Sequence, residues 1–241
     1  MNCVSVICRR PNDIWVEFLS KFTNYDVFIV IDDNSIDYKE KYKEYTKINI
    51  IQIDNEECKE AGFTGMCLVD PNIKKEVVAW DKALYYFSTI NTNYENIWFI
   101  EDDVFFYNEE TLMEIDSNNQ GVDLISTSYK KRFSFRKNMW LWDKINIKFN
   151  LPYYQAMSCA VRASKLLLSK IKEYATEYKE LFYLEALFPT ICMRNDLKCN
   201  ISNKLKNIVY KREYTINDIN KNELYHPMKN INDHIVLRRF L

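Results

Sequence analysis

Three adjacent acidic residues, Glu101, Asp102 and Asp103, stand between two apolar runs of the sequence, residues 97–100 and 104–106. Three carboxylates this close repel one another unless a cation neutralises them. Their oxygen atoms suit Mg²⁺ or Mn²⁺, which keep coordination positions open for the phosphate oxygens of a substrate. The apolar flanks predict that the cluster ends a buried strand, whereas a solvated acidic turn is the alternative interpretation. We therefore expect a divalent metal site here.

A second acidic pair, Asp32 and Asp33, ends another apolar run, residues 27–31. At the carboxyl end of a parallel strand, a carboxylate can accept a hydrogen bond from a ribose hydroxyl or a base N–H. The same pair, followed by Asn34 and Ser35, is equally typical of a turn or a helix cap. We expect it at the same sheet edge as the first cluster.

The alternation of short apolar runs with helical patterns predicts how these acids are positioned. Strands are expected at residues 3–8, 26–31, 48–53 and 96–100, and helices at 13–22 and 75–90. This order is typical of βαβ units and predicts a mostly parallel sheet with helices on both faces. Ligands of such sheets bind beyond the carboxyl ends of the strands, where both acidic groups fall.

The second half of the chain has a less regular pattern, and its elements are correspondingly less sharply defined. A helix capped by Asn108 is expected to reach residue 115, followed by a strand at 123–128 and a long loop or hairpin insertion at 132–150. A strand at 153–162 then enters a helix at 164–178. A second helix, at 180–193, is bent at Pro189, and short strand-like pieces follow residue 200.

Composition excludes several classes of protein. Only three of the 241 residues are glycine, too few for a Gly-rich loop of the P-loop or dinucleotide-binding type. The formal net charge of −1 offers no basic surface for nucleic acid or for an anionic membrane. The seven cysteines are interpreted as reduced core thiols. No signal peptide and no run near the ~20 apolar residues of a membrane span is evident, so a cytoplasmic location is expected.

Together these features resemble the metal-dependent glycosyltransferases of the GT-A fold, with Glu101-Asp102-Asp103 in the place of their DxD-type motif. The resemblance runs from the opening strand with Arg9, through Asp32 and Asp33 and the helical segment 79–84, to the tail segment 226–229. It implies an α/β fold, a GT-A-like (Rossmann-like) mostly parallel mixed sheet sandwiched between helices. It further implies one domain over residues 1–241, in which residues 1–107 bind the nucleotide sugar and residues 108–241 bind the acceptor and close over the metal and phosphates.

The resemblance also assigns roles within the motif. Asp103 would ligate Mn²⁺ or Mg²⁺, and Glu101 would contact the ribose or a metal-bound water. A glutamate in first place departs from a strict DxD, which leaves the roles of Glu101 and Asp102 open. Arg9, Asp32 and Asp33 would belong to the donor site.

The tail and the helix before the motif supply further donor-site candidates. His226 can offer a neutral imidazole to the metal, and Lys229 can neutralise phosphate charge, as often happens in the family. His226 could equally be a packing residue. Asp81 and Lys82 are expected near the donor pocket, bound to a sugar hydroxyl and to a phosphate respectively, although a charged pair on an amphipathic helix is commonly a surface feature.

Inversion of the anomeric centre needs a carboxylate that deprotonates the acceptor hydroxyl, in surroundings that raise its pKa. Glu185, within the apolar segment 181–188, is the candidate for this base, with an exposed helical position as the alternative. Tyr154 and Gln155 are expected to bind the acceptor.

These expectations define a hexosyl- or pentosyltransferase that moves a sugar from a UDP- or GDP-type donor to a glycan or another hydroxyl acceptor. Two other functions stay open. A metal-dependent phosphodiesterase or nuclease could also place acids at a strand end, although the basic surface of a nuclease is missing. A catalytically silent module could bind sugar nucleotides with the same fold.

Overall fold

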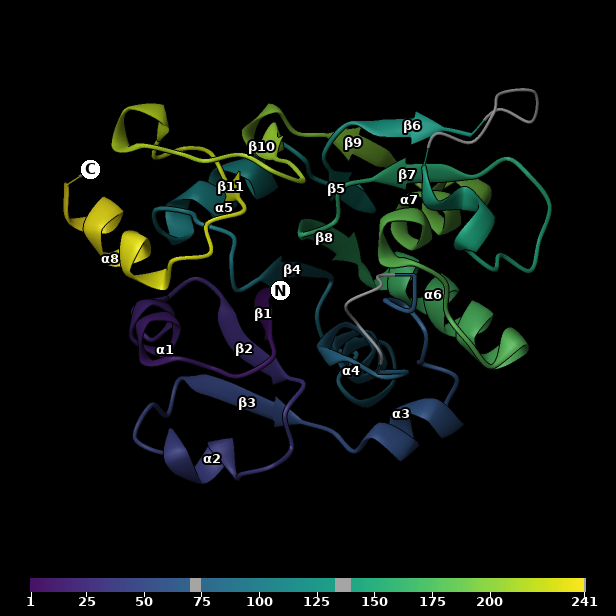
Figure 1. The fold of residues 1–241 in the computed structure, drawn as a ribbon, viewed down its shortest axis with the longest axis horizontal. Helices are drawn as coiled ribbons and strands as arrows, with labels where there is room; N and C mark the ends of the chain where they lie inside the picture. Colours follow the sequence, from purple (N-terminus) through teal and green to yellow (C-terminus); the bar gives the residue numbers. More distant parts are fainter. Residues whose placement is uncertain (70–74, 133–139, 241) are drawn as a thin grey trace.

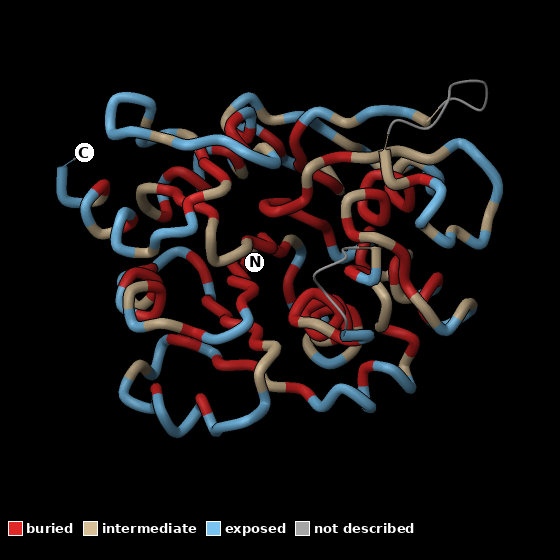
Figure 2. Tube along the Cα trace, viewed as in Figure 1, coloured by how far each residue is buried: buried red, intermediate tan, exposed pale blue. Residues whose placement is uncertain are grey.

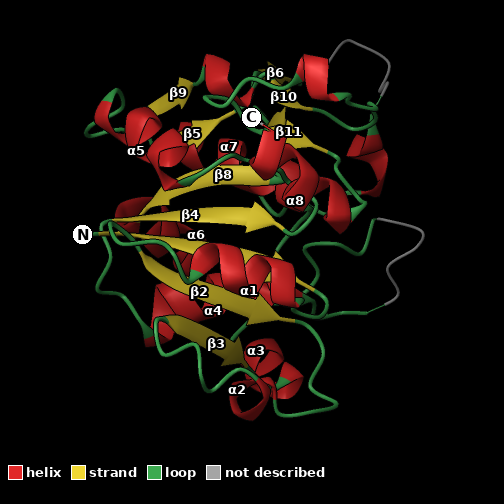
Figure 3. Cartoon of the chain, turned by 90° about the vertical axis from the view of Figure 1, so that its left-hand side faces the viewer, coloured by secondary structure: helices red, strands yellow, loops and turns green. Residues whose placement is uncertain are grey.

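The computed structural model describes residues 1–69, 75–132 and 140–240. Within these residues, seven strands form one central sheet in the order β3-β2-β1-β4-β8-β5-β9. Its strands are β1 (Asn2–Cys8), β2 (Asp26–Ile31), β3 (Ile48–Gln52), β4 (Asn96–Glu101), β5 (Leu124–Ser126), β8 (Ala160–Ser164) and β9 (Cys199–Ile201). Neighbouring strands are parallel except where β8 pairs with β4 and β5 (Figures 1 and 3).

Two short two-stranded sheets lie outside the central sheet. One pairs β6 (Tyr129–Lys131) with β7 (Tyr154–Ala156), and the other pairs β10 (Asn207–Ile208) with β11 (Tyr225–His226). The helices are α1 (Asp13–Leu19), α2 (Tyr38–Lys41), α3 (Asn55–Glu60), α4 (Ala79–Tyr85), α5 (Glu109–Ser117), α6 (Lys165–Tyr178), α7 (Leu184–Arg194) and α8 (Ile231–Phe240). A π-helix, Tyr86–Ile90, continues α4.

Strand β1 shows how the sheet builds two cores. Successive side chains of a strand point to opposite faces. Cys3 and Ile7 therefore pack with α4, α6 and α7, whereas Val4, Val6 and Cys8 pack with α1 and α5. Figure 2 shows the buried strands at the centre with exposed segments around them, and Figure 3 shows helices on both sides of the sheet. The mixed α/β fold predicted from the sequence, a mostly parallel sheet between helices, is confirmed.

Element bounds agree best where the apolar pattern is strongest. Strand β2 has the predicted bounds, and Asn108 caps α5 by accepting a hydrogen bond from the Thr111 backbone N–H. The helix expected at 75–90 begins only at Ala79, and the strand expected at 153–162 is two strands, β7 and β8, separated by residues 157–159. Residues 133–139 of the expected insertion lie outside the described part of the chain.

No helix within the described residues combines the length and the apolar character that crossing a bilayer requires.

Candidate metal and nucleotide site

The ends of β1, β2 and β4 bring both predicted acidic groups to one edge of the sheet. The Asp32 backbone N–H donates to the Cys8 carbonyl (3.0 Å), and the Asp102 backbone N–H donates to the Ile7 carbonyl (3.2 Å). These bonds continue the parallel pairing beyond the strands. They leave Asp32 and the acidic cluster on either side of the end of β1, where a cavity opens.

The cavity at this edge has a volume of about 730 Å³. Its described lining includes eight of the residues singled out in the sequence, which converge from β1, β2, β4, α7 and the tail: Arg9, Asp32, Glu101, Asp102, Asp103, Glu185, His226 and Lys229. The structure thus brings together side chains separated by up to 220 positions of sequence.

The tail reaches the acidic cluster through backbone hydrogen bonds. Phe105 and Tyr225 form an antiparallel bridge, with N–H to carbonyl distances of 2.9 Å in both directions. The Met228 backbone N–H donates to the Asp103 carbonyl at 2.7 Å. His226, which lies between these two attachments, is consequently held beside the cluster.

The tautomer of His226 follows from its hydrogen bond. Its Nδ1 lies 2.7 Å from the Val209 carbonyl oxygen, which can only accept, so Nδ1 carries the proton. Nε2 of the neutral ring then presents a lone pair toward the carboxylates, 3.3 Å from Asp103 Oδ1 and 3.9 Å from Glu101 Oε2. A histidine that ligates a metal usually donates its other ring N–H to a carbonyl or carboxylate in this way.

One carboxylate oxygen of the cluster lacks a hydrogen-bond partner among the described residues. Asp103 Oδ1 is buried and forms no hydrogen bond with any described residue, although it lies against the ring of His226. Glu101 Oε1 accepts a 2.7 Å hydrogen bond from the indole N–H of Trp80, which fixes its carboxylate and leaves Oε2 facing His226. Several lone pairs thus face one another, and a divalent cation among them is the arrangement that their chemistry favours.

Burial and mutual repulsion raise the pKa of two of these acids. Burial raises the pKa of Asp102 to about 7, and the neighbouring Asp103 and Glu101 add to the shift. Burial, followed by the charge of Asp103, raises the pKa of Glu101 above its usual range. Burial lowers the pKa of His226, but Asp103 and Glu101 outweigh it and the net shift is upward. A cation would relieve this accumulation of negative charge.

Asp32 and Lys75 form an ion pair at the opposite side of the cavity. Lys75 Nζ lies 3.0 Å from Asp32 Oδ2, while Asp32 Oδ1 is buried without a hydrogen bond to a described residue. Arg9 and Lys229 are exposed at the rim. Three cationic side chains, of Arg9, Lys75 and Lys229, thus line the same cavity as the acidic cluster.

Three predicted donor-site residues are not among the described residues that line this cavity. Asp33 instead accepts hydrogen bonds from Arg10, from the Ser35 backbone N–H and from the Tyr38 hydroxyl, which lower the pKa of its carboxyl. This is the turn chemistry considered as the alternative for the pair.

Asp81 and Lys82 lie beneath the cavity, fully buried on α4. Asp81 accepts backbone N–H groups of Met66 and Val78, and burial raises its pKa to about 7. Lys82 Nζ donates to the carbonyl of Asp32 at 2.8 Å and to that of Ile31 at 3.4 Å. Both side chains hold the backbone around the cavity, so the structure does not bring them to a phosphate or a sugar.

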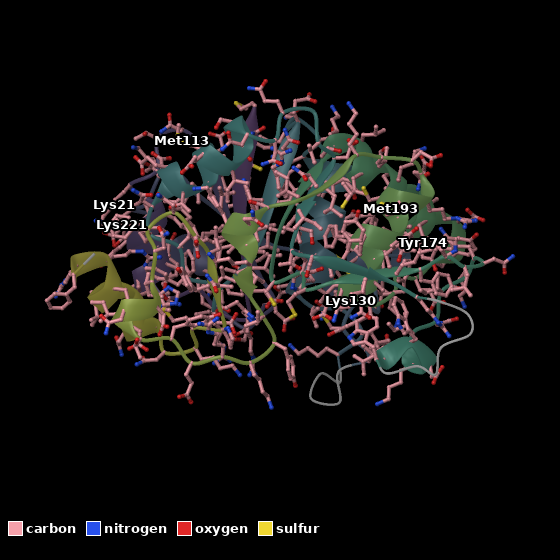
Figure 4. The ribbon with its side chains drawn as sticks, turned by 90° about the horizontal axis from the view of Figure 1, so that it is seen from above. Lys21, Met113, Lys130, Tyr174, Met193 and Lys221 are labelled. Atoms are coloured by element: carbon pink, nitrogen blue, oxygen red, sulfur yellow. The ribbon has the colours of Figure 1, made fainter. Side chains whose placement is uncertain are left out.

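A second cavity, of about 780 Å³, adjoins the first. The two share four described lining residues, Met157, Tyr183, Glu185 and Tyr210. Gln155 lines the second cavity, as does Lys130 of β6, which is labelled in Figure 4, whereas Tyr154 is not among the described residues that line either one.

Glu185 stands at the junction of the two cavities, in the first turn of α7. Burial, with a contribution from the charge of Glu101, raises its pKa to about 7. A carboxyl with this pKa can accept a proton near neutral pH, which is the property of a general base.

The lining residues that sequence reasoning missed include Lys75, Cys159 and Tyr210. Lys75 was placed inside a helix that in fact begins at Ala79, and Cys159 was interpreted as a core thiol. Cys159 lies in the site because β8 runs antiparallel beside β4, and no local sequence pattern predicts this pairing.

Comparison with known proteins gives matches among solved structures alone. No family model and no curated protein matches the sequence. Among solved structures, the galactosyltransferase LgtC in complex with donor and acceptor sugar analogs matches with a TM-score of 0.52 at 12% identity, covering 100% of this chain and 96% of that one. The fold is therefore that of LgtC, a GT-A, Rossmann-like fold.

Two other solved structures match with TM-scores below 0.5. The 4-diphosphocytidyl-2C-methyl-D-erythritol synthase from Anaerococcus prevotii gives 0.48 at 12% identity, covering 99% of this chain and 96% of that one. Core-mannan synthase A from Aspergillus fumigatus, in a Mn/GDP form, gives 0.43 at 12% identity, covering 83% and 72% respectively.

Proposed function

We propose that this protein is a metal-dependent glycosyltransferase that moves a sugar from a nucleotide-diphosphate sugar to an acceptor hydroxyl. The observation that carries the proposal is the arrangement of Asp103, Glu101 and the Nε2 lone pair of His226 at the end of β4, next to a rim of cations. A shared fold alone does not give a function. The similarity to LgtC, whose structure contains donor and acceptor sugar analogs, supports the proposal.

In this proposal each residue of the first cavity has a separate task. Asp103 and His226 hold Mn²⁺ or Mg²⁺, and Glu101 and Asp102 complete its surroundings. The bound cation would neutralise charge on the departing diphosphate. Lys229, Arg9 and Lys75 attract the phosphates by charge, and Asp32 accepts hydrogen bonds from the nucleoside.

The second cavity is the proposed acceptor site. Gln155 offers amide hydrogen-bonding groups, and Glu185 at the junction takes the proton of the attacking hydroxyl. A base placed on the side opposite the leaving diphosphate would give inversion at the anomeric carbon.

A thermal-shift experiment tests the proposal. UDP or GDP at about 100 Kd with Mn²⁺ would stabilise the fold by ~2.7 kcal/mol, which raises Tm by roughly 5–10 °C for a chain of this size. Asp103→Asn should remove the shift, whereas Asp196→Asn, at an exposed position outside both cavities, should keep it. The best nucleotide then selects the donor sugars for a transfer assay. Absence of any shift in the unmodified protein, with either metal and either nucleotide, would contradict the proposal.

A further inference from the structure

Cys159 is a cavity residue to which the proposed function gives no task. It directly precedes β8, and its carbonyl accepts the Glu101 backbone N–H at 2.9 Å, which extends the antiparallel pairing of Ile100 with Ala160. Residues directly opposite in an antiparallel pair carry their side chains on the same face of the sheet. The thiol of Cys159 therefore lies beside the carboxylate of Glu101, and only 6% of the residue is exposed.

Three different donor atoms meet at this point. The Cys159 sulfur, a Glu101 carboxylate oxygen and a His226 ring nitrogen all lie within 4.8 Å of one another. Asp103 Oδ1 adds a fourth donor, 3.3 Å from His226 Nε2. Metal–ligand bonds of about 2.0–2.3 Å hold neighbouring ligand atoms roughly 3–4 Å apart, so small side-chain movements would bring these donors onto one ion. An ion with five or six coordination positions would keep at least one of them open for the diphosphate.

Sulfur changes which ion such a site prefers. Mg²⁺ takes oxygen ligands, while thiolate and imidazole ligands favour transition metals such as Zn²⁺ and Co²⁺. We propose that Cys159 is a direct ligand of the metal, together with Glu101, Asp103 and His226, and that its sulfur makes the site select transition-metal ions over Mg²⁺. The inference rests on the proposed metal-dependent function and narrows the metal that serves it.

Ligation by Cys159 exchanges one bond for another. The S–H bond breaks, the sulfur electron pair forms the bond to the metal, and the proton leaves to solvent. No oxidant or further reactant takes part. The thiol also packs with the core beside Ala160, so a purely structural role makes the opposite prediction, namely that the sulfur has no influence on metal choice.

Metal binding without nucleotide tests the inference. Chelator-treated protein is titrated with Co²⁺, and the near-ultraviolet charge-transfer absorption from sulfur to cobalt is recorded. Unmodified protein should develop this band and saturate at one equivalent, and Cys159→Ser should lose it. Calorimetry should show Zn²⁺ affinity falling by about tenfold in Cys159→Ser, equal to ~1.4 kcal/mol, with Mg²⁺ affinity unchanged. Cys58→Ser, which removes a fully buried thiol that does not line the cavity, is the matched control and should keep both band and affinity.

The possible results separate this inference from the proposed function. Saturable metal binding without a sulfur band, or with the same metal preference in Cys159→Ser, would overturn the role of Cys159 and leave the glycosyltransferase proposal standing. Absence of any metal binding to the unmodified protein would overturn both. If Cys159→Ser does not fold, the ¹¹³Cd resonance of the unmodified, cadmium-loaded protein decides, because a sulfur ligand shifts it far from the position of an oxygen and nitrogen site.

Discussion

At the scale of single residues, the site depends on how neighbouring groups orient Glu101 and His226. The indole N–H of Trp80 fixes one oxygen of Glu101, and the Val209 carbonyl fixes the tautomer of His226. Each contact leaves one lone pair directed at the same point. The acidic motif was evident in the sequence, and so was the histidine. Their orienting partners were not, because a hydrogen-bond partner 17 or 21 positions away is chosen by the fold.

Trp80→Phe should weaken metal binding while the fold persists. Phenylalanine keeps the ring contacts with Phe99 and Phe188 but loses the hydrogen bond to Glu101. Loss of such an orienting partner typically lowers metal affinity about 10–100-fold. Calorimetric titration with Mn²⁺ measures the change. Trp98→Phe is the control, since its indole N–H binds Asp116 instead, and an equal loss of affinity in that variant would contradict the role of Trp80.

If Glu185 is the proposed base, the rate of transfer depends on pH. The raised pKa of about 7 means that this carboxyl is largely protonated below pH 7 and becomes a competent base above it. The rate of transfer should therefore rise as the pH increases through 7. Glu185→Gln should lower kcat by about 10²–10⁴-fold and remove this rise, with the nucleotide-dependent thermal shift retained. A pH profile measured with saturating donor distinguishes these outcomes, and an unchanged profile in Glu185→Gln would assign the base elsewhere.

At the scale of secondary structure, helix α4 holds the end of β2 in place beside the cavity. Lys82 reaches from α4 to the end of β2 and donates to the carbonyls of Ile31 and Asp32. Strongly apolar strands such as β2 could be predicted with correct bounds, because burial on both faces leaves a continuous apolar run. The position of Lys82 could not be predicted, since a lysine in a helical pattern is ordinarily exposed and only the packing of α4 against the sheet buries it.

Lys82→Met should destabilise the fold through this contact. Methionine fills similar volume but leaves buried carbonyls without a donor, at a cost of about 1–3 kcal/mol. Urea denaturation gives the free energy of unfolding. Lys21→Met, at an exposed position labelled in Figure 4, should change it by less than about 0.5 kcal/mol. Equal stability of the two variants would show that the buried amine contributes nothing.

At the scale of the whole molecule, one sheet joins the two halves of the chain. Strands β1 to β4 come from residues 1–107, and β5, β8 and β9 come from residues 108–241. A buried polar cluster links the halves further, because Asp116 of α5 accepts hydrogen bonds from the side chains of Asn2, Tyr25, Trp98 and Arg162. We propose on these grounds that residues 1–241 form a single domain. The sequence pattern could not predict that β8 lies antiparallel between β4 and β5, because strand order depends on contacts between distant parts of the chain.

Arg162→Met tests whether the halves unfold together. Removing the arginine leaves Asp116 without its buried cationic partner, which typically costs about 3–5 kcal/mol. If the chain is one domain, the loss should lower the denaturant midpoint of a single transition, seen at the same concentration by tryptophan fluorescence and circular dichroism. Two separated transitions would instead show that the halves are independent.

The short pairings that attach the tail also affect how often the tail opens. His226 belongs to β11, which pairs with the two-residue strand β10 and, through Tyr225, with Phe105, whereas Glu101 ends a six-residue strand inside the main sheet. Short peripheral pairings open far more often than central strands. If the protein binds the proposed metal and nucleotide, Glu101 would stay in place while the tail that carries His226 opens, and we expect the nucleotide to leave during that opening. The opening of β11, more than formation of the glycosidic bond, would then limit the rate of turnover.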